Sequence, residues 1–506
     1  MPDATTVTDL IAAAADADAT AIGAPERSPM SYGALRTLAA ATGSALAAAG
    51  IGRGDRVAIV CPNGPEMAAA FVAIACTATT APLNPAYRAE EFDFYLGDLK
   101  AKALVVQDGM DTPAREVAAK HGIQVLTLTP DPAGPAGAFS LSGGAAGGGS
   151  PEPVDADDVA LILHTSGTTS RPKMVPLSHR NVTASARHIG ATLQLGPDDR
   201  CLNIMPLFHI HGLIAAVLSS LAAGGSVWCT PGFNALKFFA WLSEIKPTWY
   251  TAVPTMHQAI LTRAGRNAEV IAANPLRLIR SSSSSLPPQV MAALEETFSA
   301  PVIESYGMTE AAHQMASNLL PPGARKPGTV GPAAGPEIAI MAEDGGLQPQ
   351  GGVGEVVIRG PNVTSGYLEN PAANADGFRD GWFRTGDQGM LDADGYLTIT
   401  GRLKEIINRG GEKISPREVD EILLDHPAVA QAVTFAVPHD KLGEDVAAAV
   451  VLEEGASAAE TEIRAFAGER LADFKVPRKL LILDEIPKGA TGKLQRIGLA
   501  EKLGLA

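Results

Sequence analysis

The sequence predicts an α/β protein with a large N-terminal part of layered subdomains and a small α+β domain at the C-terminus. Three observations lead to this prediction. Short apolar runs alternate with helical patterns, a segment rich in glycine and proline interrupts them, and charged residues become frequent after "GYLTITGR". A chain of 506 residues also exceeds what one hydrophobic core normally supports, so we expect at least two structural units.

The alternation of apolar runs and helical patterns indicates largely parallel sheets. Each short apolar run has the length and composition of a buried strand, and these runs are found at residues 56–61, 103–106, 123–128, 227–229 and 248–253. Helical patterns follow three of these strands, at residues 64–75, at residues 236–245 and from Pro254 onward. A strand that is followed by a helix is the repeating unit of a parallel α/β layer.

Two changes in composition predict the domain organisation. Residues 130–153 read "PDPAGPAGAFSLSGGAAGGGSPEP", which lacks the bulk to pack and predicts a loop or linker, so a new subdomain begins near Val159. The charged stretch from Leu403 onward leads into further apolar runs such as "AVTFAVP" and "VAAAVVL". We therefore expect an N-terminal domain at 1–402 and a C-terminal domain at 403–506.

The overall charge and the cysteines restrict the class of protein. A net charge of -15 argues against a nucleic-acid-binding or anionic-membrane surface. The four cysteines lie singly in apolar stretches, as buried thiols do in a reducing compartment. The N-terminus lacks the features of a signal peptide, and the short apolar stretch from Met67 favours a buried helix over a membrane span. We expect a cytoplasmic protein, and the sequence does not predict its oligomeric state.

A loop rich in hydroxyl groups follows the apolar run "VALIL". The stretch "HTSGTTSRPK" is not a Walker A loop, because its lysine follows a proline and no GxxxxGK[ST] spacing is present. Hydroxyl groups, backbone amides and a lysine can cradle the phosphates of a nucleotide, although a polar surface turn is the alternative. The candidate phosphate-binding residues are Thr165, Ser166, Gly167, Thr168, Thr169 and Lys173.

Three further motifs follow in a fixed order: "SYGMTEAAHQM" at 305–315, "WFRTGDQGMLDADGYLTITGRLKEIINRGGEKISP" at 382–416 and "PKGATGKLQR" at 487–496. With these four motifs, the chain resembles the adenylate-forming superfamily of acyl-CoA synthetases, luciferases and peptide-synthetase adenylation domains from about residue 30 to the end. Within it, "PLFHIHG", "RSSSSSLPP" and "YGMTEAAHQMASN" are most similar to oxalate-CoA ligases. Met174 departs from the glycine that is usual in the family's phosphate loop.

The resemblance implies a ligase that uses ATP, Mg²⁺ and coenzyme A in two half-reactions, with a mobile C-terminal domain. Since no protein nucleophile is needed, catalysis should rest on positioning and on cations. The resemblance implies that Lys493 contacts the reacting oxygens and that Glu310, beside Thr309, binds Mg²⁺. A solvated lysine and an acid at a helix N-terminus are the alternatives for Lys493 and Glu310.

The resemblance also implies residues for the nucleotide and for coenzyme A. Asp387 would accept the ribose hydroxyls with help from Arg402. The adenine would lie between Tyr306 and the serine-rich backbone. Lys404 matches the hinge, and Gly410 and Gly411 would let the pantetheine pass. A structural role in a turn is the alternative for Asp387, Arg402 and the two glycines, and a core tyrosine is the alternative for Tyr306. The candidate nucleotide-binding residues also include Gly307, Ser283 and Ser284.

The resemblance implies that the activated acid is oxalate, a small dianion whose pocket needs hydrogen-bond donors rather than an apolar tunnel. The candidate substrate residues are His211, Ser282, Ser283 and His313, with His209 as a gate of the acyl channel. A structural histidine is the alternative for His313. Other functions that we considered are a medium- or long-chain fatty acyl-CoA ligase, an adenylation enzyme that loads a separate carrier protein, a non-catalytic nucleotide-binding relative and a luciferase-like oxidase.

Overall fold

The computed structural model describes residues 4–14, 16–144, 149–165, 172–487 and 496–505. It divides the chain into two compact units. Among the described residues, the larger unit holds the chain up to Thr165 and then residues 173–338 and 358–383, and the smaller unit holds Pro172, 339–357 and 384–505. The α/β layers expected from the sequence are confirmed in the larger unit. The division at residue 402 stays a prediction.

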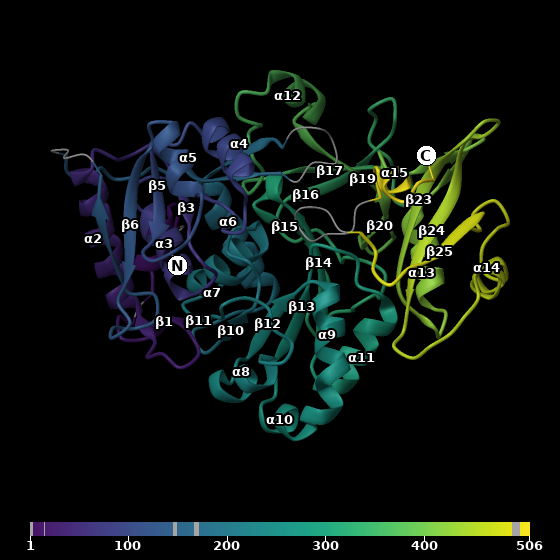
Figure 1. The fold of residues 1–506 in the computed structure, drawn as a ribbon, viewed down its shortest axis with the longest axis horizontal. Coiled ribbons are helices and arrows are strands. Elements are labelled where there is room, and N and C mark those ends of the chain that lie inside the picture. The colour runs from purple at the N-terminus through teal and green to yellow at the C-terminus, as the bar shows by residue number, and fades with distance from the viewer. Residues whose placement is uncertain (1–3, 15, 145–148, 166–171, 488–495, 506) are drawn as a thin grey trace. The chain divides into compact units, whose positions relative to one another are not determined.

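A seven-stranded sheet forms the first layer of the larger unit (Figure 1). Its strands, in spatial order, are β7 (Phe139–Gly143), β6 (Gln124–Pro130), β5 (Ala103–Gln107), β3 (Arg56–Val60), β4 (Thr79–Pro82), β8 (Val159–His164) and β9 (Met174–Ser178). The inner pairs are parallel, and the two edge pairs β6–β7 and β8–β9 are antiparallel. Helices α4 (Ala89–Leu99) and α5 (Ala114–Lys120) alternate with these strands along the chain, although the sequence analysis named neither of them.

Part of the predicted linker is a strand. Residues 139–143 form β7, which pairs antiparallel with β6 from Leu126 to Pro130. Phe139 is buried and Leu141 is half-buried, so two apolar side chains suffice to dock the segment on the edge of the sheet. The sequence pattern missed this strand because its stability comes from backbone pairing with β6, not from a run of bulky residues.

An eight-stranded sheet forms the second layer of the larger unit. Its strands, in spatial order, are β15 (His313–Ser317), β14 (Val302–Met308), β13 (Leu278–Ser281), β12 (Trp249–Ala252), β10 (Arg200–Asn203), β11 (Ser226–Cys229), β1 (Thr20–Gly23) and β2 (Met30–Ser31). Strands β10 to β14 are parallel neighbours, and β15 returns antiparallel to β14. Helices α8 (Phe238–Ile245), α9 (Pro254–Ala264), α10 (Ala268–Ala273) and α11 (Pro288–Phe298) connect these strands.

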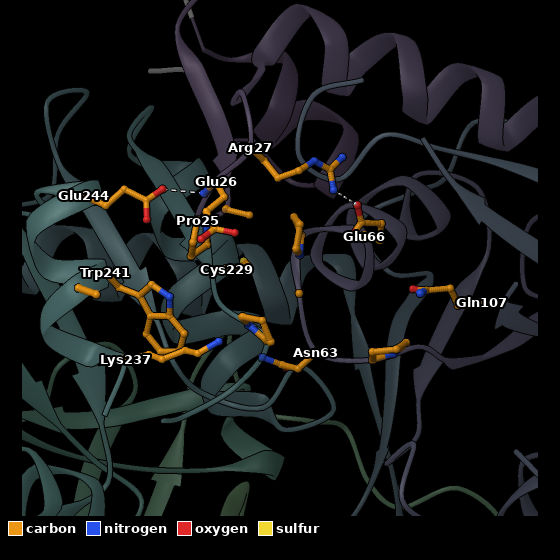
Figure 2. Close-up of a pocket in the computed structure, with 16 residues that line it drawn as sticks. Pro25, Glu26, Arg27, Asn63, Glu66, Gln107, Cys229, Lys237, Trp241 and Glu244 are labelled. Carbon is orange, nitrogen blue, oxygen red and sulfur yellow. Dashed lines mark hydrogen bonds and ion pairs between the residues drawn. The ribbon is translucent and has the colours of Figure 1, made fainter. Parts of the chain in front are cut away.

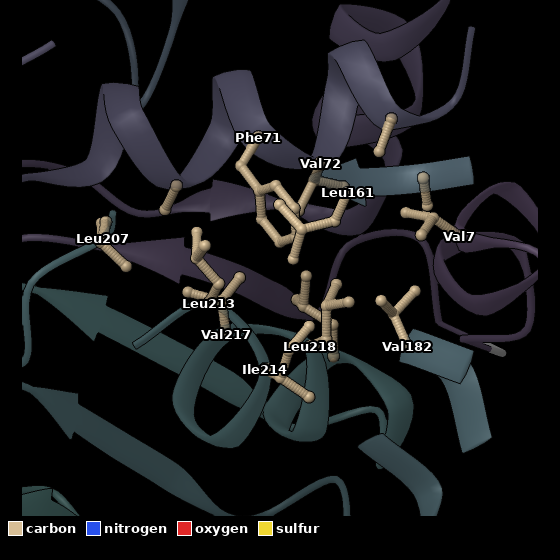
Figure 3. Packing of buried hydrophobic residues seen from close by; sticks show 14 of the residues in the cluster. Val7, Phe71, Val72, Leu161, Val182, Leu207, Leu213, Ile214, Val217 and Leu218 are labelled. Atoms are coloured by element: carbon tan, nitrogen blue, oxygen red, sulfur yellow. The ribbon is translucent and has the colours of Figure 1, made fainter. Parts of the chain in front are cut away.

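Two largely apolar helices lie in the largest core cluster (Figure 3). Every residue of α3 (Pro65–Ala75) except Glu66 is buried, and so is every residue of the π-helix η1 (His211–Leu218). Phe71 and Leu161 lie opposite Leu213 and Val217 in this core. The stretch from Met67 is thus a buried helix, as predicted. Within the described residues, no helix is long and apolar enough to cross a membrane.

The remaining helices of the larger unit are α1 (Val7–Ala12), α2 (Tyr32–Ala48), α6 (His179–Thr192), α7 (Ser219–Ala222) and α12 (Pro371–Gly377). The next part of the chain forms a five-stranded sheet. Four of its strands, in spatial order, are β16 (Glu337–Met341), β17 (Val353–Arg359), β19 (Trp382–Leu391) and β18 (Phe378–Arg379), and β20 (Leu397–Arg402) also pairs with β19. These strands carry the chain from the larger unit into the smaller one.

The smaller unit contains a second five-stranded sheet, of β22 (Glu412–Ile414), β21 (Ile407–Arg409), β24 (Gly443–Leu452), β23 (Val429–His439) and β25 (Lys479–Ile482), in which β25 pairs parallel with β24. Helices α13 (Pro416–Leu424) and α14 (Glu460–Gly468) pack with it around a core of their own, and α15 (Leu499–Lys502) contacts β23. This mixture of antiparallel strands and helices is the α+β fold that the sequence predicted for the C-terminal region.

Candidate active site

The two ends of the hydroxyl-rich loop are held together at the edge of the seven-stranded sheet. The backbone N–H of Thr165 donates to the carbonyl oxygen of Lys173 at 2.9 Å, and the N–H of Lys173 donates to Thr165 Oγ1 at 3.3 Å. Met174 begins β9 and is buried, so a side chain replaces the usual glycine without breaking the strand. Ser166, Gly167, Thr168 and Thr169 lie outside the described residues.

Tyr367 links two of the predicted site residues. Its hydroxyl donates to Glu310 Oε1 at 2.9 Å, and Lys173 Nζ lies 4.4 Å from the centre of its ring. Both Tyr367 and Glu310 are buried, and the N–H of Thr364 donates to the backbone oxygen of Glu310 at 2.7 Å. The sequence analysis missed Tyr367. The feature of the sequence that could have indicated Tyr367 is an aromatic residue in the polar turn "TSGYLEN".

The Glu310 carboxylate fits a magnesium ion that is shared with a nucleotide. Mg²⁺ in phosphate-transfer sites takes one or two carboxylates and completes its shell with phosphate oxygens and water. Among the residues that the structure describes, no group of three or more His, Cys, Asp or Glu side chains could hold a metal by itself. Thr309 and Glu310 begin the short helix η3 (Thr309–Ala311), next to β14.

The bend between β14 and β15 brings His313 against Gly307. A Cβ atom on residue 307 would lie 1.8 Å from the backbone oxygen of His313, so only glycine fits there. Ala312 and His313 have φ angles of 47° and 97°, which side chains rarely adopt. Such strain persists only where the surrounding structure enforces it, and it is typical of ligand sites.

The predicted substrate residues meet at this bend. His211 Nδ1 lies 3.0 Å from Ser283 Oγ, and the rings of His211 and His313 are 5.0 Å apart. Both histidines are buried, and Ser283 has a φ angle of 71°. Ser282 is buried too, but its hydroxyl donates to the backbone oxygen of Ser305 at 2.9 Å. The hydroxyl that contacts the histidine pair is therefore that of Ser283, not that of Ser282.

A buried arginine lies behind the two histidines. Arg280, on β13, is fully buried, and its Nη2 lies 3.4 Å from His313 Nδ1 and 3.3 Å from Gln314 Oε1. Its Nη1 donates to Thr251 Oγ1 at 3.5 Å, and this same oxygen lies 2.6 Å from His211 Nε2. Burial lowers the pKa of the Arg280 guanidinium to about 9, so it stays charged at neutral pH. The sequence analysis missed Arg280 and Thr251, whose signal was a lone charge in the buried strand "LIRS".

The other predicted residues of the larger unit lie close to these in the chain. Tyr306 and Gly307 are half-buried at the end of β14, and Ser284 is exposed just beyond Ser283. His209 is half-buried, two residues before η1, with its ring centre 4.5 Å from that of Phe208. A π-helix begins at His211. π-Helical turns are rare in proteins and often lie at functional sites.

The predicted residues of the smaller unit form two local structures. Arg402 Nε lies 2.7 Å from Asp387 Oδ1, and the two residues are register partners on β20 and β19. Lys404 lies in the turn that follows, in which the N–H of Glu405 donates to the Arg402 oxygen at 2.8 Å. Gly410 and Gly411 form the turn between β21 and β22 with φ angles of 61° and 99°. Lys493 lies outside the described residues.

A cavity of about 430 Å³ lies elsewhere in the larger unit (Figure 2). Arg27 and Glu66 form an ion pair of 3.0 Å on one side, and Lys237, Trp241 and Glu244 lie on the other. None of the predicted site residues lines this cavity. Its mixture of opposite charges is unsuited to a fatty acyl chain.

Comparisons with known proteins agree with this geometry. The family model described as AMP-binding enzyme matches residues 11–368, and the model of an AMP-binding enzyme C-terminal domain matches residues 418–493. The chain is 49% identical over 460 residues to the oxalate-CoA ligase of Arabidopsis thaliana, with 88% of each chain covered. It is 43% identical over 482 residues to the oxalate-CoA ligase of Saccharomyces cerevisiae, covering 89% of this chain and 87% of the relative. ATP-bound MatB from Rhodopseudomonas palustris superimposes with a TM-score of 0.88, at 32% identity over 98% of this chain and 99% of that one.

Proposed function

The chain belongs to the family of AMP-binding enzymes and is an ATP-dependent, AMP-forming acid-CoA ligase, and we propose that the acid is oxalate. The family resemblance seen in the sequence motifs is confirmed, and ATP, Mg²⁺ and coenzyme A are the partners that this activity requires. The fatty acyl, carrier-loading, luciferase-like and non-catalytic alternatives are not favoured.

The reaction consists of two displacements. A carboxylate oxygen of the acid attacks the α-phosphorus of ATP, the bond from that phosphorus to the bridging oxygen breaks, and pyrophosphate leaves. The thiolate of coenzyme A then attacks the acyl carbon, the bond from carbon to phosphate oxygen breaks, and AMP leaves. The thiol proton passes to solvent. Neither step needs a protein nucleophile, so the chain contributes position and charge.

The observation that carries the oxalate proposal is the buried pair of His211 and His313, whose rings lie 5.0 Å apart and which contact hydroxyl and guanidinium groups. Oxalate has no carbon chain to bury, so its second carboxylate must be met by hydrogen-bond donors. A fatty acid needs an apolar tunnel, whereas the apolar helices α3 and η1 are buried in a packed core. His209 would gate entry of the acid.

We assign the nucleotide to the residues that the motifs predicted. Lys173 and the hydroxyl-rich loop would bind the β- and γ-phosphates, and Glu310 with Thr309 would hold Mg²⁺, which neutralises phosphate charge when bound. Tyr367 supports this assignment because it contacts both Lys173 and Glu310. Asp387, oriented by Arg402, would accept the ribose hydroxyls, with Tyr306, Gly307 and the backbone of Ser283 and Ser284 around the adenine.

The C-terminal domain would serve both half-reactions by turning about Lys404. In one orientation Lys493 would reach the reacting oxygens, and in the other the Gly410–Gly411 turn would pass the pantetheine. A cytoplasmic location is part of the same proposal, and it is supported by the four cysteines, which are all free thiols, as is expected in a reducing compartment.

The test is a pyrophosphate-release assay with oxalate, malonate, acetate and octanoate, with and without coenzyme A. We expect the wild type to prefer oxalate. His313→Ala should lower kcat/KM for oxalate about 5- to 150-fold and for acetate much less, because each lost donor to the second carboxylate costs about 1–3 kcal/mol. Ser282→Ala should have a weaker effect than Ser283→Ala. A wild type that prefers octanoate, or an equal loss for all four acids, would refute the oxalate assignment.

A further inference from the structure

Glu355 is a buried carboxylate on β17 that lies outside the predicted motifs. It belongs to the smaller unit, and both of its oxygens contact one segment of the neighbouring strand β19. Glu355 Oε2 lies 2.8 Å from Nε and 2.7 Å from Nη2 of Arg384, and Oε1 accepts from the N–H of Gly386 at 2.9 Å. A buried carboxylate is costly unless it is paired and hydrogen-bonded, so these contacts favour one position of the segment "RTGD".

The residue that Glu355 holds has a backbone conformation that favours glycine. Gly386 has a φ angle of 73°, and a Cβ atom there would meet nothing within 4 Å. The conformation, and not a lack of space, therefore explains the glycine. Because glycine adopts positive and negative φ angles about equally well, contacts from outside must select one of them. The carboxylate supplies such a contact immediately before Asp387.

The backbone of Asp387 is held through the next residue of β17. The N–H of Asp387 donates to Thr385 Oγ1 at 3.1 Å, and the Thr385 hydroxyl donates to the backbone oxygen of Val356 at 2.7 Å. Thr385 and Asp387 are both buried. Two adjacent residues of β17 thus position two successive backbone amides of β19.

The carbonyl side of Gly386 is held as well. Its oxygen accepts from the N–H of Leu403 at 2.9 Å, one residue beyond Arg402. Arg402 is the register partner of Asp387, and its Nε lies 2.7 Å from Asp387 Oδ1. The strands β17 and β20, which both pair with β19, therefore contribute to the position of the Asp387 carboxylate.

We propose that Glu355 is a positioning residue for recognition of the ribose. It holds the Gly386 amide and the Arg384 guanidinium, and it thereby directs the Asp387 carboxylate toward the ribose hydroxyls. This proposal rests on the proposed function for the ribose contact of Asp387, but not on which acid is activated. A carboxylate that accepts from two hydroxyls at once is sensitive to its orientation, so fixing that orientation in advance raises the affinity for the nucleotide.

The test measures the dissociation constants of MgATP and of its 2′,3′-dideoxy analogue by calorimetry, without acid or coenzyme A. The wild type should bind the analogue about 10- to 100-fold more weakly, because it lacks the hydroxyls that donate to a charged group. Glu355→Gln keeps the shape of the side chain but not its charge. It should raise the dissociation constant of ATP about 5- to 50-fold and that of the analogue less than about twofold.

Two further variants complete the comparison. Thr385→Val removes the hydroxyl that accepts from the N–H of Asp387, and it should also weaken ATP more than the analogue. Glu337→Gln is the matched control, because it removes an ion pair of 2.7 Å with Arg359 at an exposed position of the same sheet. It should change neither dissociation constant.

A double variant shows whether Glu355 acts through Asp387. Glu355→Gln combined with Asp387→Asn should bind ATP no more weakly than Asp387→Asn alone, because the group that Glu355 positions is already lost. Unchanged affinity for ATP in Glu355→Gln, equal weakening of both nucleotides, or additive effects in the double variant would overturn the proposal. If the wild type binds both nucleotides equally well, the ribose contact of Asp387 is wrong and the proposal fails with it. A preference for another acid would refute the oxalate assignment alone, since no acid takes part in these titrations.

Discussion

The backbone oxygen of His313 lies 1.8 Å from the point at which a Cβ atom of Gly307 would stand. The missing side chain allows β15 to fold back on β14 with His313 at a φ angle of 97°. Any larger residue at position 307 must push the His313 backbone away. The clashing atom belongs to the backbone, so a change of side-chain rotamer cannot relieve the clash.

We therefore expect Gly307→Ala to lower kcat/KM for oxalate by about 100-fold or more, since displacing a binding group by about 1 Å can have that effect. Steady-state pyrophosphate release measures it. Gly265→Ala is the matched control, because a Cβ atom there meets nothing within 4 Å and the backbone is helical. Wild-type activity in Gly307→Ala would show that the position of His313 does not matter.

A second prediction concerns the hydroxyl of Tyr367, which donates to Glu310 Oε1 at 2.9 Å. Tyr367→Phe keeps the ring beneath Lys173 but frees the carboxylate to rotate. Loss of a group that orients a metal ligand typically costs 10- to 100-fold in metal affinity or activity, so the Mg²⁺ concentration for half-maximal activity should rise at least about tenfold. Tyr32→Phe is the control, because its hydroxyl donates to the oxygens of Leu221 and Gly225. If both variants needed the same Mg²⁺ concentration for half-maximal activity, the assignment of Glu310 as the metal ligand would be wrong.

Much of the fold could be predicted from the sequence because its strands are short apolar runs and its helices are amphipathic or largely apolar. The strands at 56–60, 103–107 and 249–252 and the buried helix at 65–75 follow from local composition alone. Strand β7 could not be predicted in this way, since its five residues are held by pairing with β6. Local patterns do not reveal such tertiary pairing.

The candidate site was predicted only where a motif contained it. Glu310, His211 and His313 lie in recognisable motifs, but Arg280 and Thr251 lie in apolar strands whose neighbours are unknown before the sheet order is known. The pairing of Thr251 with Arg280 across β12 and β13 brings the two together. Tyr367 meets Glu310 across 57 residues of sequence, which no local pattern can show.

A third prediction concerns pH and the buried His179. Its Nδ1 accepts from the N–H of Val7 at 3.2 Å, and its Nε2 has no partner in the described structure. Burial lowers the pKa of His179 to about 4, with partial compensation by the charges of Asp158 and Asp9. The unfolded chain, with a histidine pKa near 6.5, binds a proton that the folded chain does not. The stability from this residue is thus lost as the pH falls from about 6.5 toward 4.

We expect the free energy of unfolding of the wild type to fall by about 2 kcal/mol more than that of His179→Gln between pH 7 and pH 5. Glutamine can still accept from Val7 but does not titrate. All four tryptophans lie in the larger unit, so tryptophan fluorescence during urea unfolding reports on that unit. Parallel pH dependences of wild type and variant would contradict the prediction.

The final prediction separates the two half-reactions through Lys493. If this lysine supplies positive charge only while the adenylate forms, Lys493→Ala should lower oxalate-dependent exchange of pyrophosphate into ATP by about 100- to 1,000-fold, the usual effect of removing one preorganised group that stabilises the transition state. Conversion of preformed oxalyl adenylate to the thioester in the presence of coenzyme A should stay within about threefold of wild type.

Lys502→Ala, at an exposed position in the helix α15, is the matched control for loss of a lysine charge near the C-terminus, and it should leave both half-reactions unchanged. Each half-reaction is measured alone, so a general loss of folding would lower both rates together and would be seen as a lower melting temperature. Equal losses in the two half-reactions at an unchanged melting temperature would mean that Lys493 acts in both. The proposal that the C-terminal domain presents different residues in the two steps would then be wrong, because one fixed arrangement would account for the whole reaction.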